Sequence, residues 1–438
     1  MAVKGRLALS HALMAGAAAA ALGIASQAHA AGFYLEDQSA KGTGRAFSGE
    51  ASDTGSESLF YNPASIAGIT GFEFSSSATA ILASANVTDT GSTITRPGQA
   101  TTSVGGAPRA FNPVAPGVIP SAAFAYGLPH NLSIGMSVTS PFSFATKYNG
   151  DSFVRYTADS TRLTTIDIQP TIAWRPLPWL GIGAGPVIEY SDAVFSSALP
   201  QLTPGGSDGY EYLHGDGWNV GYTVGAQIHP TQRVTVGLAY RSKVDHTLNG
   251  NVQTSGLTGL LALAGANFNQ AASAKFTTPW TATFGVRWKV TDKLTVEGQG
   301  VHFGWSDFNQ IQFTPTIVPA ALENYHDTTN GAVGFDYDVT PKWTVRAGVQ
   351  YDPTPTPNVG RDARVPDGDR YLFAAGSSYK LSPRMIMDAG ISYVDFQKTH
   401  INRDATAYGG TIAVTPISIE GDVDASAVTM SLGSRFYF

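Results

Sequence analysis

Apolar side chains that could form a binding surface gather in one segment between two strand-like patterns. In residues 254–274 they are Leu257, Leu260, Leu261, Leu263 and Phe268. Their spacing, near i, i+3 and i+4, is typical of one face of an amphipathic helix. An apolar helix face in water is costly unless it packs or binds something. The spacing therefore predicts a short helix that either binds a hydrophobic ligand or packs against a neighbouring loop.

Patterns typical of phosphate and metal binding are missing from the sequence. It contains no Walker loop and no H-x-x-x-H, which position a phosphate or a metal ion. It has no cysteine, so disulfides and thiolate chemistry are excluded. Asp362 and Asp367 fall in a proline-rich stretch, 353–368, that reads as a loop. The sequence predicts a protein that is not an enzyme and that binds no cofactor or metal.

Composition and the N-terminus indicate an exported protein. Charged residues make up 14% of the chain, against about 25% in soluble domains. The formal charge of −6 gives no reason to expect nucleic-acid binding. Lys4 and Arg6 precede an apolar stretch at 12–25, and Ala-His-Ala at 28–30 suits a signal peptidase. We expect residues 1–30 to be a signal peptide, and the remaining sequence has no apolar run long enough for a transmembrane helix.

Alternation with a period of two runs through the rest of the chain and predicts half-exposed β-strands. In 218–228, for example, Trp218, Val220 and Tyr222 alternate with small and polar residues. Polar faces rich in Gly, Thr, Ser and Gln suit a barrel lumen, and the apolar faces suit lipid. A soluble β-sandwich also alternates. Strand lengths of about 9–11 residues or more, and the Trp and Tyr residues at strand ends, favour an outer-membrane barrel.

The strand pattern predicts an all-β fold, a transmembrane antiparallel β-barrel of 14 strands. The segments are 72–87, 120–127, 131–146, 162–175, 179–192, 217–229, 233–249, 276–290, 293–305, either 308–315 or 328–338, 343–353, 369–380, 384–400 and 424–438. An even number is expected of a bacterial barrel. Backbone groups inside a bilayer must all be paired, so the sheet has to close on itself.

Residues 31–71 do not alternate and are punctuated by Gly, Ser and Pro. A non-strand segment of this length before a barrel is either a flexible tail or a plug inserted in the lumen. Wide barrels need something to fill or gate the lumen, which favours the plug.

Motifs along the expected mature chain resemble those of a known family. They are Ala31-Gly32-Phe33, Gly42-x-Gly44-Arg45-Ala46-Phe47-Ser48-Gly49-Glu50, Asn62-Pro63-Ala64, Gly217-Trp218-Asn219-x-Gly221, Tyr240-Arg241-Ser242-x-Val244, Pro366-Asp367-x-Asp369-Arg370, Gly390-Ile391-Ser392-Tyr393 and a terminal Phe438. In this order they resemble the FadL family of outer-membrane transporters of long-chain fatty acids and, in some branches, aromatic hydrocarbons. The resemblance spans nearly the whole mature chain. It implies a fourteen-stranded barrel with an N-terminal hatch, hence a signal peptide at 1–30, a hatch at 31–71 and a barrel at 72–438.

The resemblance also implies that ligand leaves sideways through a kink in the third strand, here 132–148. Ser140, Pro141 and Phe142 stand at its centre, and because proline cannot donate to a β-ladder, broken pairing is expected there. An ordinary bulge without a transport role is the alternative. Other strand patterns also contain proline, so proline alone does not identify a gate.

Further ligand-binding and hatch residues follow from the resemblance. Phe33 matches a position whose ring lies near bound ligand, and Asn62, Pro63 and Ala64 match the hatch motif. Asn-Pro favours a turn, so this motif either holds the hatch in shape or touches the ligand.

A basic residue that meets a ligand carboxylate inside the barrel is also implied. The candidates are Arg287, Lys289 and Arg346 on inward faces, and His326, where some relatives have a basic residue. The segment 190–201 contains no Lys or Arg, unlike the matching loop of a fatty-acid transporter, which leaves room for an uncharged substrate. An outer hydrophobic groove is expected between two long loops, 193–216 and 254–274.

The predicted function is passive transport of hydrophobic molecules, long-chain fatty acids foremost, with capture at apolar outer loops and lateral release. Uptake of aromatic hydrocarbons, a general polar porin and a surface receptor or adhesin are the alternatives. The expected partners are the hydrophobic ligand, outer-membrane lipid and lipopolysaccharide, with no nucleic acid. The chain is expected to be a monomer in the bacterial outer membrane.

Overall fold

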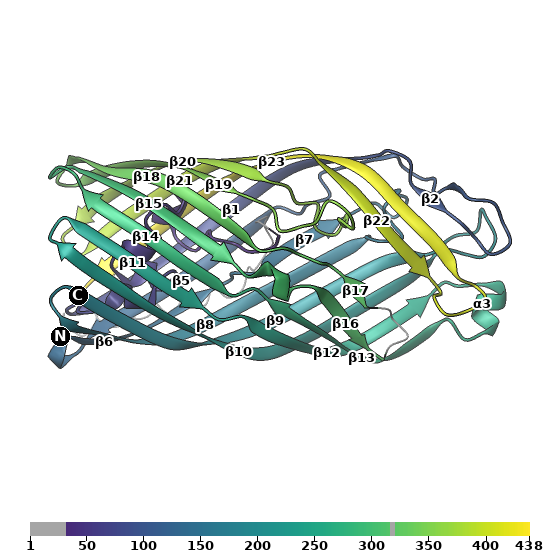
Figure 1. The fold of residues 1–438 in the computed structure, drawn as a ribbon, viewed down its shortest axis with the longest axis horizontal. Helices are drawn as coiled ribbons and strands as arrows, with labels where there is room; N and C mark the ends of the chain where they lie inside the picture. The colour runs from purple at the N-terminus through teal and green to yellow at the C-terminus, as the bar shows by residue number, and fades with distance from the viewer. Residues whose placement is uncertain (1–31, 316–319) are drawn as a thin grey trace, which may run out of the picture.

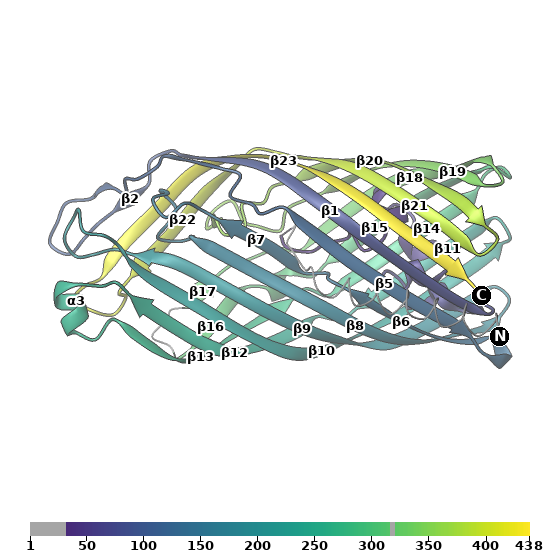
Figure 2. The ribbon, with the colours of Figure 1, turned by 180° about the vertical axis from the view of Figure 1, so that it is seen from behind.

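A closed antiparallel β-barrel forms most of the molecule (Figures 1 and 2). The computed structural model describes residues 32–315 and 320–438, so the predicted signal peptide lies outside the described residues. Within those two ranges, no helix has the length and apolar character needed to cross a membrane. β1 (Phe72–Asp89) pairs with β23 (Thr415–Tyr437), so the first and last strands close the sheet on itself.

The barrel has 14 strands, as the alternation predicts. The undivided strands besides β1 and β23 are β5 (Gly117–Gly127), β8 (Ser160–Leu177), β9 (Leu180–Leu199), β10 (Gly209–Thr231), β18 (Thr328–Thr340), β19 (Trp343–Asp352) and β20 (Arg370–Ser382). The divided strands are β6 (Leu132–Thr139) with β7 (Ser143–Lys147), β11 (Val234–Arg241) with β12 (Val244–Ser255), β13 (Phe268–Thr278) with β14 (Thr281–Lys289), β15 (Leu294–Phe303) with β16 (Gln310–Thr314), and β21 (Met385–Phe396) with β22 (Thr399–Ala407). The tenth strand is β18, because β16 pairs with β13 and so continues the ninth strand.

The period of two separates an outer from an inner face. In β10, Trp218 and Val220 are 60% and 67% exposed, whereas Thr223 and Gln227 are buried toward the lumen. Two-residue turns such as 232–233 and 341–342 join strands at the end of the barrel where the C-terminus lies. The longer connections, with β2 (Thr93–Ile94) and α3 (Gly259–Leu263), lie at the opposite end (Figure 1).

The N-terminal segment lies inside the barrel as a plug (Figures 1 and 2). It folds into short helices, α2 (Ala40–Thr43), η1 (Glu50–Ser52), η2 (Ser56–Ser58) and η3 (Pro63–Ile66), and nearly all of its residues are buried. Ser39 begins α2 as its N-cap, because its hydroxyl accepts the Gly42 N–H at 3.0 Å. We call residues 32–38 the strap and residues 39–67 the hatch body.

Both expected outer loops, 193–216 and 254–274, are shorter than predicted. β9 and β10 remain paired from Leu180–Ile228 up to Leu199–Gly209, which leaves 200–208 as the connection. β12 and β13 pair as far as Thr254 and Phe268, so the expected helix shrinks to α3, five residues long. Backbone pairing between neighbouring strands thus continues well beyond the segments that alternate most clearly.

Candidate ligand pocket and lateral gap

Phe33, the second residue of the strap, lies at the centre of a buried aromatic cluster. Its ring centroid is 5.0 Å from those of Trp305 and Phe308, both in edge-to-face contact, and 5.7 Å from that of Phe144. Trp305 belongs to η5 (Trp305–Asp307), which turns the chain inward after β15, and Phe144 belongs to β7. Such ring pairs are favourable beyond their burial, so the cluster positions the strap.

An apolar cavity, here the inner pocket, opens beside this cluster. Apart from Ala193, its apolar lining consists of Phe33, Phe144, Leu163, Phe195, Phe276, Phe308, Ile311, Tyr325 and Val365. Its volume is only about 30 Å³, enough for one or two water molecules. A hydrophobic ligand can enter only if rings of the lining move apart.

A larger cavity of about 510 Å³, the vestibule, lies next to the inner pocket. The two share Phe195, Ile311, Glu323, Asp362 and Arg364 in their linings, so they adjoin one another at these residues. The vestibule mixes polar with apolar groups, whereas the lining of the inner pocket is mainly apolar. This gradient suits an amphiphile whose polar end stays in the vestibule.

Two arginines stand at the junction of vestibule and inner pocket. Arg403 lies 3.4 Å from the Asp362 carboxylate and 3.9 Å from that of Glu323, and it donates to the Leu322 carbonyl at 2.7 Å. Arg364 lies 3.2 Å from Asp362. Burial raises the pKa of Glu323 to about 7. The junction therefore offers guanidinium groups to a carboxylate, but such a ligand must compete with acidic side chains already bound there.

The third strand is interrupted between β6 and β7. The β5–β6 ladder ends at Ala122–Val138, and pairing between the second and third strands resumes at the Val114–Thr146 bridge. Ser140, Pro141 and Phe142 lie in this interval, here the lateral gap. The predicted break at Pro141 is thus present, and the neighbouring strand β8 continues past it without interruption.

The strap fills the lateral gap and takes over the missing backbone pairing. The Leu35 N–H donates to the Pro141 carbonyl at 2.7 Å, and Tyr34 forms a bridge with Phe142. The Gln38 amide donates to the Ser140 carbonyl at 2.9 Å and accepts the Ser140 N–H at 3.1 Å. The strap therefore acts as a short substitute strand at the gap.

Three carboxylates, of which Asp37 and Asp367 are buried and Glu36 is half-buried, lie along the strap or hold it. Asp367 accepts the Gly32 N–H at 2.8 Å, and Glu36 accepts hydrogen bonds from Asn330 at 3.1 Å and Gln350 at 2.6 Å. Burial raises the pKa of Glu36 to about 7 and the pKa values of Asp37 and Asp367 to about 6. Attachment of the strap is therefore sensitive to pH near neutrality.

The hatch body is fixed by charge. Arg45 is fully buried and contacts four carboxylates, those of Glu50 at 2.5 Å, Asp53 at 2.7 Å, Asp336 at 3.2 Å and Glu297 at 3.3 Å. The last two belong to the barrel wall, in β15 and β18. Because a buried charge that loses its partners is strongly destabilising, this cluster ties the hatch body to the wall.

The motif Asn62-Pro63-Ala64 docks the hatch body against the wall. Asn62 accepts the Ala64 N–H at 2.9 Å and donates to the carbonyls of Ala51 at 2.7 Å and Ala226 at 3.1 Å. Gly183 makes this close approach possible, because a Cβ there would lie 2.3 Å from the Pro63 carbonyl oxygen. These contacts give the motif a structural role.

The predicted basic residues lie away from the inner pocket. Arg346 bonds Asp336 at 3.0 Å, and Arg287 bonds Asp53, Asp336 and Glu297, so both belong to the hatch-body charge cluster. Lys289 and His326 are exposed. Arg287 and Arg346 face inward as expected, but the inward face at their level meets the hatch.

The apolar loop residues divide into two groups. Leu257 and Leu261 are buried, and Leu257 lies so close to Gly209 that a Cβ there would come within 2.5 Å of it. Leu260 and Leu263 are 73% and 84% exposed on α3 at the outer tip. Phe268 is half-buried at the start of β13. Loop packing thus accounts for the first group and leaves the second on the surface.

Sequence reasoning missed most of the pocket. Arg364 and Arg403 lie in and near outer connections that read as loops, and Phe144, Phe308 and Tyr325 gave no pattern of their own. The three aromatic residues within 303–308 were the sequence signal that could have identified this part of the pocket.

The closed barrel with an apolar outer face, a polar lumen and an internal hatch defines the class of outer-membrane transport barrels. A family model described as "Outer membrane protein transport protein (OMPP1/FadL/TodX)" matches residues 21–438, so the chain belongs to this family. It is therefore a bacterial outer-membrane transporter of hydrophobic compounds and not an enzyme.

Individual relatives agree with this family. The long-chain fatty acid transport protein of Escherichia coli K12 is 28% identical over 394 residues, 81% of this chain and 85% of that protein. An outer membrane protein of Neisseria meningitidis is 27% identical over 402 residues, 80% of this chain and 83% of that one.

Solved structures confirm the fold. A FadL homologue of Pseudomonas aeruginosa superposes with a TM-score of 0.83 at 23% identity, covering 93% of this chain and 100% of that one. The toluene transporter TbuX of Ralstonia pickettii gives 0.62 at 18% identity, covering 88% and 94%.

Proposed function

We propose that this protein carries long-chain fatty acids inward across the outer membrane by passive diffusion. The exposed leucines of α3 capture the ligand, the vestibule receives it, and the inner pocket takes up its alkyl chain. The ligand then leaves sideways through the lateral gap. This proposal is supported by the fatty-acid transport named for the Escherichia coli relative, which matches 81% of this chain.

One observation carries the proposal: the same ring joins the inner pocket to the lateral gap. Phe33 contacts Phe144 of the inner pocket at 5.7 Å and Phe142 of the gap at 5.8 Å. Movement of the strap that opens the pocket therefore also uncovers the gap. Burial of apolar surface, about 25 cal/mol per Å², supplies the binding energy.

A carboxylate-bearing ligand fits the junction of the two cavities. With its alkyl chain in the inner pocket, its carboxylate reaches Arg403 and Arg364, in place of the predicted Arg287, Lys289, Arg346 and His326. Guanidinium groups bind carboxylates in bidentate fashion, with charge-assisted hydrogen bonds. The ion pairs of Asp362 and Glu323 with Arg403 then weaken.

Monoaromatic hydrocarbons are the second candidate, because aromatic rings dominate the inner pocket. Phe33, Phe144, Phe195, Phe276 and Phe308 all line it, and aromatic rings pack favourably on one another. Because both arginines are already ion-paired, an uncharged ligand needs to displace no ion pair. A toluene transporter shares the fold.

Uptake by cells that lack their own fatty-acid transporter separates the candidates. Labelled oleate and labelled toluene are compared in the parent chain, in Arg403→Gln and in a control, Arg233→Gln, whose arginine pairs with Asp292 on the exposed surface. We expect saturable oleate uptake, with a half-saturation concentration raised about tenfold in Arg403→Gln and unchanged in the control.

Toluene uptake without oleate uptake, by a correctly folded barrel, would replace the fatty-acid proposal with the second candidate. The same apparent affinity for oleate in Arg403→Gln and the parent would remove Arg403 from the binding site.

A further inference from the structure

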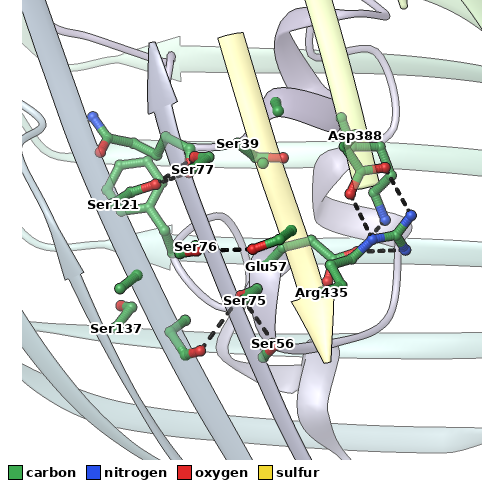
Figure 3. A pocket seen from close by; sticks show the side chains of 18 of the residues that line it. Ser39, Ser56, Glu57, Ser75, Ser76, Ser77, Ser121, Ser137, Asp388 and Arg435 are labelled. Carbon is green, nitrogen blue, oxygen red and sulfur yellow. Dashed lines mark hydrogen bonds and ion pairs between the residues drawn. The ribbon is translucent and has the colours of Figure 1, made fainter. Parts of the chain in front are cut away.

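A small polar cavity, here the hydroxyl chamber, lies beside the lateral gap, between the hatch and the wall (Figure 3). It is lined by Ser75 and Ser77 of β1, Ser121 of β5, and Ser137 and Thr139 of β6, with the strap residue Gln38 on the hatch side. Its volume is about 20 Å³, room for about one water molecule. The proposed transport route, from α3 through the vestibule and inner pocket to the lateral gap, does not use this cavity.

Two hydroxyls of the chamber have no partner among the described residues. They belong to Ser137 and Thr139, whose side chains are 1% and 4% exposed. The neighbouring hydroxyls of Ser77 and Ser121, by contrast, lie 2.7 Å apart and bond one another. Most buried hydroxyls have a partner, so these two leave hydrogen-bonding capacity in the chamber for a polar group.

The charges around the chamber are already paired. Lys41 contacts Glu57 and Asp53, and Arg435 lies 2.8 Å from Asp388 and 3.3 Å from Glu57. The chamber can therefore donate hydrogen bonds from hydroxyls without offering an unpaired cation. Hydroxyl groups bind a carboxyl group more weakly than a pair of arginines does. Weak binding suits an exit site, because the ligand must leave it.

Gln38 separates the chamber from the gap. Its side-chain amide bonds both backbone groups of Ser140 at the gap, while its backbone carbonyl oxygen accepts the Ser121 hydroxyl of the chamber at 2.6 Å. Withdrawal of the strap therefore frees Ser140 and opens the chamber toward the gap in one movement.

We propose that the hydroxyl chamber is a release site for the carboxyl head of a fatty acid, with Gln38 as the residue that closes it. The Ser137 and Thr139 hydroxyls donate to the carboxylate oxygens while the alkyl chain passes through the gap into lipid. The head group is thus never left without hydrogen bonds during exit. This inference rests on the proposed transport of fatty acids.

The test compares two double variants in the oleate uptake assay. Ser137→Ala/Thr139→Val removes the two orphan hydroxyls of the chamber. Ser133→Ala/Thr328→Val removes two other buried hydroxyls that also have no partner among the described residues and do not line the chamber. Because none of the four hydroxyls has a partner in the described part of the chain, both variants should fold as the parent does, which thermal unfolding checks.

We expect the chamber variant to lower the maximal rate of oleate uptake on the order of fivefold, about the value of one hydrogen bond. Its half-saturation concentration should stay unchanged, because capture takes place elsewhere. The control should equal the parent. Equal maximal rates in all three proteins, or equal losses in both variants, would overturn the release site while leaving fatty-acid transport intact. A parent that takes up no oleate would overturn fatty-acid transport itself, and the release site with it.

Discussion

At the scale of single residues, Glu36 makes the attachment of the strap depend on pH. Burial, and then the neighbouring Asp352 carboxylate, raise its pKa from 4.5 to about 7. A strap withdrawn into water restores the ordinary value, so the docked state binds the proton more tightly. Docking is therefore strongest below about pH 4.5, weakens as the pH rises, and levels off above about pH 7.

Hydrogen exchange of the Leu35 amide, which bonds the Pro141 carbonyl, measures this effect. In Glu36→Gln the side chain stays neutral, so we expect its strap to remain protected where the parent's loosens, between about pH 4.5 and 7. The ratio of the two exchange rates at each pH cancels the intrinsic pH dependence. Asp37 and Asp367 shift in the same direction and remain in both proteins. A constant ratio across this range would show that Glu36 does not control docking.

At the scale of elements, the proposed lateral release requires the strap to separate from the third strand. Tyr34 and Phe142 are bridge partners, and the Cα atoms of such partners lie about 4.5–5.5 Å apart, within disulfide range. The chain has no cysteine of its own, so Tyr34→Cys/Phe142→Cys can form a single bond. We expect the oxidised variant to lose at least about tenfold in oleate uptake and to recover on reduction.

The same double variant serves as its own control, because both states lack the same two rings. If oxidised and reduced proteins transport equally, the strap does not have to leave the gap. Each single-cysteine variant should be insensitive to the redox state, which separates the crosslink from chemical modification.

The strands could be predicted from sequence far better than the pocket. Alternation arises because one face of each strand meets lipid, so exposed apolar residues such as Trp218 and Val220 identify a strand from its own sequence. It also placed Arg287 and Arg346 on inward faces, but it could not tell a lumen wall that meets ligand from one that meets the hatch. Phe33 was found only through the family resemblance, since a ring in an irregular segment has no period.

At the scale of the whole molecule, the hatch consists of two parts with different attachments. The strap is held by hydrogen bonds, by ring contacts and by carboxylates that titrate near neutrality, such as Glu36. The hatch body is held by Arg45 and its four carboxylates, two of them from the wall. Under the proposed lateral release, a ligand that moves the strap opens a route through the wall without removing the plug, so hydrophobic molecules pass while the barrel stays closed to salt.

Removal of Arg45 should convert the plugged barrel into a leaky one. Replacement by methionine keeps the length but leaves Glu50, Asp53, Glu297 and Asp336 without this cation, and breaking a buried ion pair costs about 3–5 kcal/mol. We expect the hatch body to loosen and salt conductance across planar bilayers to rise well above that of the parent. Arg233→Met, which removes an exposed arginine, should conduct as the parent does. An Arg45→Met barrel that folds and stays closed would mean that the remaining contacts, those of Asn62 among them, suffice to hold the plug.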